Sequence, residues 1–223
     1  MAKTRPRRLR VIEYQVQFVS RPLEFLISAI LLAVSLPVQL SVALLIYMQL
    51  GRPVIFRQIR AGKNARKITV VKFRTMTDAR DAAGAHLPDD QRQSAMTRLI
   101  RRLRIDELPQ LWHVLRGDMA LVGPRPLLQS TVAGFGRLGE IRNSVPPGLT
   151  GWAQVSGNTR LSNAEKLAFD LWYVAHRRAG LDLRILAETL LVPLRGEVRH
   201  DARLARASRW ARERFGRAVE EAA

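Results

Sequence analysis

The most prominent pattern in the chain is an apolar run near its start. Between Phe25 and Leu50 lie 26 residues without a charge, interrupted only by serines, glutamines and one tyrosine. As a straight helix this run would reach about 39 Å, more than the roughly 30 Å of a bilayer's hydrocarbon core. The pattern predicts a membrane helix over residues 21–50. A signal peptide is not expected, because the run is too long and no small-x-small cleavage site follows it.

Two features of this segment argue against a simple crossing. Pro37 stands at its centre, where a proline removes a backbone hydrogen bond and kinks a helix. Lysines and arginines flank the segment on both sides, and the positive-inside rule places both flanks in the cytoplasm. A helix that enters, breaks near Pro37 and returns satisfies both flanks. The alternative is a single pass with an ordinary proline kink.

The pattern changes after residue 51. Two short apolar runs, 54–58 and 68–73, surround the turn 61–64 and predict a β-hairpin. Polar residues 77–90 and the Pro/Gly-rich stretch 146–158 predict loops. Helical patterns cover 91–103, 161–178 and the stretch from 181 to about 194, and the apolar side of the last one fits either the core or a membrane interface.

These elements predict an α+β, mostly helical fold with a re-entrant membrane helix. A small cytosolic catalytic domain would add a short β-hairpin and interfacial amphipathic helices. The expected units are a basic N-terminal segment 1–20, the re-entrant membrane helix 21–50, the cytosolic domain 51–194 and a tail 195–223.

Charge narrows the choice of partners. The chain has 37 Lys+Arg against 19 Asp+Glu, a net charge of +18, so the partner should be anionic. Nucleic acid, anionic lipid and phosphorylated metabolites all qualify. In the tail, arginines recur at roughly helical spacing against Leu204, Ala207, Ala211 and Phe215, which predicts a basic amphipathic helix for anionic lipid. A disordered arm is the alternative. The absence of cysteine excludes disulfides and fits a reducing compartment.

Candidate chemistry concentrates in residues 101–126. Asp106 is a good N-cap, Pro109 suits a first helical turn and Gly117 a helix end, which predicts a helix beginning at Asp106. Asp106 and Glu107 would then lie where backbone N–H groups and the helix dipole favour anions. The preceding arginines, with Arg101 beside Asp106, should keep these carboxylates ionised. By itself, the pair also fits a plain capped helix with solvated arginines.

One further residue in this stretch has a distinctive setting. Arg125 stands between Pro124 and Pro126, so its guanidinium is presented from a stiff backbone, which suits phosphate recognition.

The whole string from 101 to 126 closely resembles the signature of the bacterial sugar transferases. These are the monotopic phosphoglycosyl transferases that begin glycan assembly on a polyprenyl phosphate carrier. Further similar motifs are Gly51–Gly62, Lys72–Met76, the Pro-Gly-Leu-Thr-Gly segment from Pro147, and Phe169–Val174. The resemblance covers about residues 20–194. The chain departs from it at Leu36, where members carry the serine of a Ser-Pro break, at Glu24, where an aspartate is usual, and at Pro146 and Asn158, where many members have arginines.

The resemblance implies a reaction. A sugar 1-phosphate would pass from a UDP-sugar to a polyprenyl (undecaprenyl) phosphate with release of UMP, through a phosphosugar-aspartyl intermediate on Asp106. Glu107 would hold Mg²⁺. Lys72 and Asp182 match family residues needed for activity, although a solvated strand lysine and a helix N-terminal acid explain them equally well locally. Arg101 and Arg125 would bind phosphate, with Asn158 or Arg160 at the position of the missing arginine.

The resemblance also implies a place in the cell. The enzyme would lie in the bacterial inner membrane with its catalytic domain on the cytoplasmic face, contact inner-membrane phospholipids and initiate exopolysaccharide, O-antigen or glycoprotein glycan assembly. A homodimer is compatible with this, and no nucleic acid is expected. The rival is a membrane-anchored, non-catalytic binder of nucleic acid or anionic lipid. It explains the charge but gives no reason for the acidic pair, and no nucleic-acid motif is present.

Overall fold

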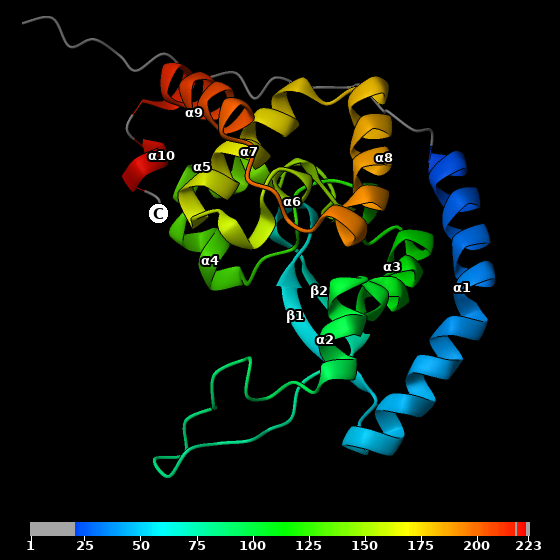
Figure 1. Cartoon of the computed structure of the whole chain (residues 1–223). Coiled ribbons are helices and arrows are strands. Elements are labelled where there is room, and N and C mark those ends of the chain that lie inside the picture. The colour runs from blue at the N-terminus through cyan, green and yellow to red at the C-terminus, as the bar shows by residue number, and fades with distance from the viewer. Residues whose placement is uncertain (1–20, 217, 222–223) are drawn as a thin grey trace, which may run out of the picture.

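The computed structural model describes residues 21–216 and 218–221, so the predicted basic segment 1–20 lies outside the described residues. Within the described residues the fold is mostly helical, as the sequence predicts, and it has a second small sheet besides the predicted hairpin (Figure 1). Helix α1 (Arg21–Leu50) runs along one side of the molecule. The remaining helices are α2 (Ala95–Arg102), α3 (Leu111–Arg116), α4 (Gln129–Gly134), α5 (Gly136–Arg142), α6 (Trp152–Val155), α7 (Asn163–His176), α8 (Ala179–Arg195), α9 (Asp201–Phe215) and α10 (Ala218–Glu221).

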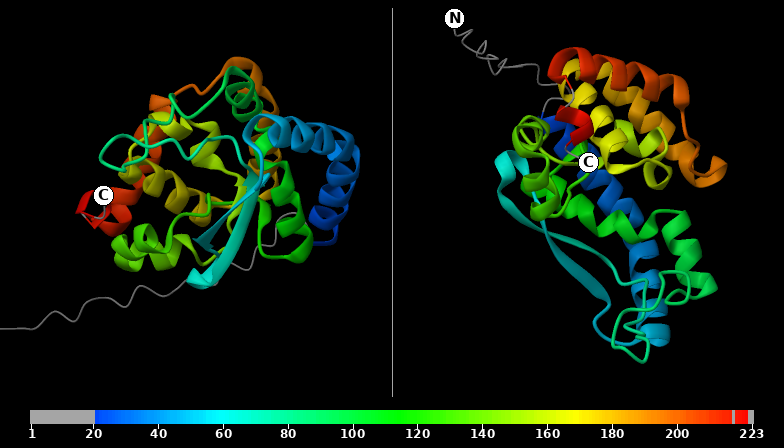
Figure 2. Two further views of the ribbon diagram at one scale, coloured as in Figure 1. Left: turned by 90° about the horizontal axis from the view of Figure 1, so that it is seen from below. Right: turned by 90° about the vertical axis from the view of Figure 1, so that its left-hand side faces the viewer.

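Helix α1 is long and apolar enough to cross a membrane, by length and composition. It continues through Pro37 without an interruption, yet its two halves run in different directions when seen from below (Figure 2). The burial of its side chains is the reverse of that in a water-soluble protein. Glu24, Ser28 and Gln39 are buried against the protein, while most of the large apolar residues of the helix are exposed. Such a surface is typical of a helix surrounded by lipid rather than water.

The start of α1 is fixed to the rest of the protein by polar contacts. Arg21 pairs with Glu24 at 3.3 Å and donates a hydrogen bond of 3.2 Å to the carbonyl of Met119. Glu24 accepts from the N–H of Leu121 at 3.4 Å. Glu24 therefore joins α1 to strand β3 (Ala120–Val122), and Arg21 joins it to the residue before that strand.

The predicted hairpin is confirmed. Strands β1 (Ile55–Ala61) and β2 (Lys67–Phe73) pair antiparallel, and a short 3-10 turn η1 (Lys63–Ala65) connects them. The chain can reverse in this turn because Asn64 adopts a left-handed conformation, with φ of 53°. Strand β2 packs against a second 3-10 helix, η2 (Ile105–Gln110), and this contact brings Lys72 to the acidic pair.

The predicted helix start is confirmed to within one residue, but Asp106 does not cap the helix and the first turns are 3-10 rather than α-helical. Asp106 and Glu107 lie in the first turn of the 3-10 helix η2, and the residue before this helix is Arg104, in a left-handed conformation with φ of 59°. The N–H of Glu107 bonds back to the carbonyl of Arg104, so no capping side chain is used. The predicted end at Gly117 is confirmed, because this glycine closes α3 with φ of 80°.

The stretch 146–158 is not only a loop, as the sequence suggested. It contains α6 and strand β4 (Gly148–Thr150), which pairs parallel with β3. A side chain at Gly148 would come within 2.0 Å of the backbone nitrogen of Gly123, and one at Gly151 within 2.1 Å of its carbonyl. These glycines allow two backbones to touch just before Arg125.

The C-terminal helices cover the end of the molecule opposite the junction of α1 and β1 (Figure 1). Helix α7 begins with a capping box between Ser162 and Glu165, and α9 packs along it. Leu204 and Ala207 of α9 belong to the main core and Ala211 to a second cluster with α7. The apolar side of α9, which the sequence analysis assigned to lipid, is therefore covered by the protein itself.

Candidate active site

A cavity of about 520 Å³ lies where η2, β2, the segment after β3 and the loop after α6 meet. Its volume falls within the range of small-molecule sites, roughly 300 to 1,000 Å³. It brings together six of the predicted site residues. These are Lys72, Arg101, Asp106, Glu107, Arg125 and Asn158, and the lining also includes Arg102, Arg104, Arg142, Thr159, Lys166, Asp170 and Glu197. The excess of cations makes the cavity a site for a multiply charged anion.

Asp106 is the carboxylate of this cavity without a partner. It is buried, and among the described residues it makes no hydrogen bond or ion pair. Burial, followed by the neighbouring Glu107, raises its pKa from 3.8 to about 6, although Lys72 and Arg101 act in the opposite direction. Burial therefore outweighs the cations in setting the pKa of this carboxylate. At pH 7 the group is still mostly ionised, and a raised pKa makes a carboxylate more basic.

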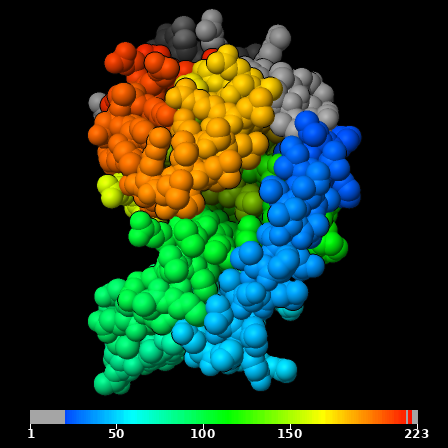
Figure 3. Space-filling model, turned by 45° about the vertical axis from the view of Figure 1, so that its right-hand side comes forward, coloured from blue at the N-terminus to red at the C-terminus, as the bar shows by residue number. Residues whose placement is uncertain are grey.

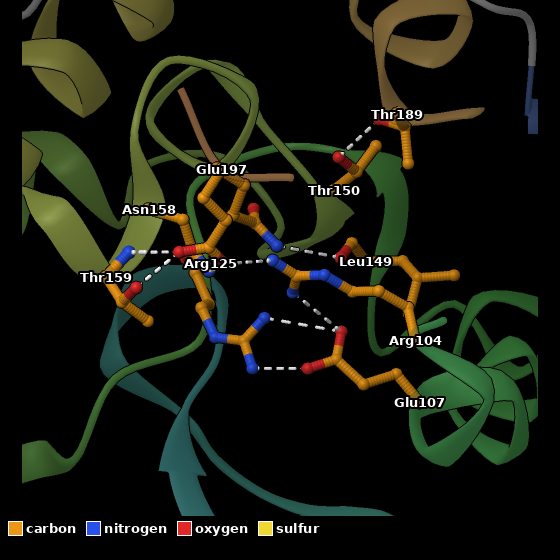
Figure 4. A network of polar contacts seen from close by, with 10 residues as sticks. Arg104, Glu107, Arg125, Leu149, Thr150, Asn158, Thr159, Thr189 and Glu197 are labelled. Carbon is orange, nitrogen blue, oxygen red and sulfur yellow. Dashed lines mark hydrogen bonds and ion pairs between the residues drawn. The ribbon is translucent and has the colours of Figure 1, made fainter. Parts of the chain in front are cut away.

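Glu107, the adjacent residue, is engaged on both oxygens. It forms a two-pronged pair with Arg125, whose Nη1 lies 3.3 Å from Oε2, and Arg104 approaches Oε2 at 3.7 Å (Figure 4). Burial acts to raise the pKa of Glu107, but the charge and hydrogen bonds of Arg125 prevail and hold it below its ordinary value. The two neighbouring acids therefore have opposite electrostatic settings.

The backbone of Arg125 is fixed by a hydrogen bond from another side chain as well as by the two neighbouring prolines. Arg142 of α5 donates to the carbonyl of Arg125 at 2.6 Å and pairs with Asp170 of α7 at 2.8 Å. Both members of this pair are almost completely buried. Neither residue is predicted from the sequence, because residues 28 positions apart give no local signal of a pair. The pair fixes the base of Arg125 while its guanidinium lies in the cavity.

Lys72 reaches the cavity from the open end of the hairpin, away from the turn that joins β1 and β2. It stands opposite Phe56 in the strand register, and its Nζ lies 5.4 Å from the centre of that ring. Burial, together with the charges of Arg101 and Arg125, lowers its pKa, while Asp106 and Glu107 act to raise it. A partly desolvated cation next to Asp106 suits contact with a phosphate oxygen.

Two predicted site residues lie elsewhere. Asp182, in the first turn of α8, is buried outside the cavity lining and accepts a hydrogen bond of 2.8 Å from the hydroxyl of Tyr173. Burial raises its pKa to about 6. Arg160 is exposed at the end of the 3-10 helix η3 (Asn158–Arg160) and does not line the cavity either.

The carboxylates of the cavity fit one of the ways in which proteins bind magnesium. The described residues contain no group of three or more His, Asp or Glu side chains placed to hold a metal. Mg²⁺, however, commonly uses only one or two carboxylates together with substrate phosphates and water. Asp106 and Glu107 fit that mode of binding, with Glu107 sharing its oxygens with Arg125. A metal held by protein side chains alone would not fit.

A mostly ionised carboxylate in a cationic cavity suits an enzyme that acts on a phosphate-bearing substrate. Residues 15–196 match the family model described as bacterial sugar transferase, and the chain therefore belongs to that family. This confirms the resemblance found in the sequence, and with it the enzymatic class.

Three relatives illustrate the family. An uncharacterized sugar transferase of Bacillus subtilis, EpsL, is 48% identical over 143 residues, covering 64% of this chain and 71% of the relative. A UDP-N-acetylgalactosamine-undecaprenyl-phosphate N-acetylgalactosaminephosphotransferase of Aeromonas hydrophila is 36% identical over 193 residues, covering 80% and 44%. An undecaprenyl-phosphate glucose phosphotransferase of Komagataeibacter xylinus is 41% identical over 184 residues, covering 76% and 35%. The chain thus spans less than half of the last two.

Proposed function

We propose that this protein transfers a sugar 1-phosphate from a UDP-sugar to a polyprenyl phosphate and releases UMP. The observation that carries the proposal is the unpartnered, buried carboxylate of Asp106 in a cavity lined by Lys72, Arg101 and Arg125. The names of the relatives from Aeromonas and Komagataeibacter describe transfer of this kind to undecaprenyl phosphate. Because those names carry two different sugars, the donor sugar of this chain has to be found by screening UDP-sugars.

The proposed chemistry has two displacements. An oxygen of Asp106 attacks the phosphorus nearest the sugar, and the bond from that phosphorus to the bridging oxygen breaks, so UMP leaves with the electron pair. An oxygen of polyprenyl phosphate then attacks the same phosphorus and restores the Asp106 carboxylate. Asp106 is suited to the first step because it is mostly ionised at pH 7 and needs no base.

The cations of the cavity have separate roles in this scheme. Lys72 and Arg101 would contact the phosphate under attack, because both line the cavity and both lower the pKa of Asp106 through their charge. Arg125, fixed by Glu107 and by Arg142, would hold the diphosphate in one orientation. When bound with the diphosphate, Mg²⁺ would neutralise its charge, held by Glu107 and Asp106.

We further propose that α1 enters the inner membrane from the cytoplasmic side and returns to it. Its bend, its buried polar residues and its exposed apolar surface support this arrangement. Figure 3 shows the N-terminal half of α1 beside α8 on one face of the molecule, and α8 exposes Leu183, Leu190 and Leu194. These leucines would lie in the interface with inner-membrane phospholipids, which would bring the cavity to the polyprenyl phosphate.

The test is a half-reaction without the acceptor. The purified protein is incubated with Mg²⁺ and each UDP-sugar in turn, and UMP release and intact mass are measured. With the correct donor we expect about one equivalent of UMP and the added mass of one phosphosugar. Asp106→Asn should abolish both signals, because a neutral amide is a poor nucleophile. Asp118→Asn, which alters an aspartate outside the cavity, should retain both. Full turnover without an adduct, or an adduct on Asp106→Asn, would refute the covalent step.

A further inference from the structure

Glu197 is a carboxylate of the cavity that lies one residue past the family match at 15–196. Its Oε1 accepts hydrogen bonds from Nδ2 of Asn158 and, at 3.1 Å, from Nη2 of Arg104. Its Oε2 accepts from the hydroxyl of Thr159 and, at 3.1 Å, from the backbone N–H of Thr159 (Figure 4). One side chain thus joins two walls of the cavity.

The backbone directs Glu197 to this position. Gly196 ends α8 with φ of 77° and ψ of 179°, a conformation that is essentially restricted to glycine. Open space surrounds the position where its side chain would be, so the conformation and not crowding requires glycine here. The turn at Gly196 reverses the chain and places Glu197 over the loop that follows α6.

The linker 196–200, between α8 and α9, makes further contacts with the same loop. The N–H of His200 donates to the carbonyl of Ser156 at 3.1 Å, and Nη1 of Arg199 donates to the carbonyl of Arg160 at 3.1 Å. The linker therefore holds the loop on both sides of Asn158 and Thr159, and Glu197 is the member of the linker that also contacts the opposite wall.

That opposite wall carries the acidic pair. Arg104 precedes η2 in a strained left-handed conformation and lies between Glu197, at 3.1 Å, and Glu107, at 3.7 Å. Glu107 in turn pairs with Arg125. Removing the charge at position 197 would leave Arg104 with Glu107 as its remaining partner and would release the loop at Thr159.

We propose that Glu197 is a positioning residue that fixes the width of the nucleotide-sugar cavity by holding the Asn158–Thr159 wall to Arg104. This inference rests on the proposed function, since it names a cavity wall for the UDP-sugar. It also changes the role of Asn158, which the sequence analysis assigned to phosphate. Its amide nitrogen donates to Glu197, so Asn158 is part of this cavity wall, and only the second N–H of the amide is left for a phosphate.

A matched control is available in Glu188 of α8. Its side chain is 23% exposed, against 24% for Glu197, and it also pairs with arginines, at 2.7 Å to Arg203 of α9 and 2.8 Å to Arg184. Glu188 does not line the cavity. Loss of its charge would weaken the attachment of α9 without altering a cavity wall.

The experiment compares full-length wild type, Glu197→Gln and Glu188→Gln in detergent. We expect Glu197→Gln to raise KM for the UDP-sugar about tenfold with kcat changed less than about threefold, as for loss of one charge-assisted binding arrangement. Hydrogen exchange at the amide of Thr159 should also become faster. Glu188→Gln should leave KM and this exchange unchanged, even if it lowers the melting temperature.

The inference is overturned if Glu197→Gln keeps the wild-type KM and Thr159 exchange, or if Glu188→Gln raises KM equally. Should Glu197→Gln fail to fold, Gly196→Ala, which keeps the carboxylate but strains its turn, must produce the same rise in KM. The exchange measurement needs no substrate. A wild type that releases no UMP from any UDP-sugar would therefore refute the proposed function, while Thr159 exchange still decides the role of Glu197.

Discussion

The pKa of Asp106 leads to a prediction about the pH dependence of the first half-reaction. Its value of about 6 means that the carboxylate is about nine-tenths ionised at pH 7 and about one-tenth ionised at pH 5. If the ionised form is the nucleophile, kcat/KM for UMP release should fall about tenfold per pH unit below this value. The half-reaction without polyprenyl phosphate is the right assay, because a phosphate monoester has its own second pKa of roughly 6.

Two substitutions should shift the acidic limb of the pH profile, the fall in kcat/KM below about pH 6, in opposite directions. Lys72 lowers the pKa of Asp106 through its charge, so Lys72→Met should shift the limb to higher pH. Glu107 raises that pKa, so Glu107→Gln should shift it to lower pH even though both variants are slower than wild type. Shifts in opposite directions would distinguish a change in the pKa of Asp106 from a general loss of activity in both variants.

The measurement is rapid-quench UMP release from pH 4.5 to 8 under subsaturating UDP-sugar. Intact mass at each pH verifies that the released UMP corresponds to a covalent adduct. A limb near pH 4 in wild type, or shifts of the same sign in both variants, would show that the group that titrates is not Asp106 in the electrostatic setting described above.

Three further predictions concern other parts of the molecule. Arg142→Met should lower the free energy of unfolding by about 3 to 5 kcal/mol in a denaturant titration, because it leaves Asp170 charged and buried; a change within error would refute a structural role for the pair. Asp182→Asn should lower the melting temperature and leave KM for the UDP-sugar unchanged, since it touches Tyr173 and not the cavity; a selective rise in KM would place it in the site. Single cysteines at Thr4 and Ala82, in a chain that has none, should both be protected from an impermeant thiol reagent in intact cells; labelling of one alone would establish a through-membrane span.

Features with a local cause could be predicted from the sequence. The membrane-length helix follows from an uninterrupted apolar run, and the hairpin from two β-rich runs around a turn, because both depend on neighbouring residues. The stiff setting of Arg125 likewise follows from its two prolines. The resemblance added that Asp106, Glu107 and Lys72 act at one site, and the structure places all three around the same cavity.

The partners of these residues were decided by the tertiary structure. Glu107 pairs with Arg125, and Glu197 reaches Asn158 from 39 positions away, distances along the chain at which no periodicity or turn signal operates. The parallel pairing of β3 and β4 depends in the same way on two backbones meeting at Gly148. The pKa of Asp106 also belongs to this level, because nearby charges can be counted in a sequence, whereas burial exists only once the chain has packed around the carboxylate.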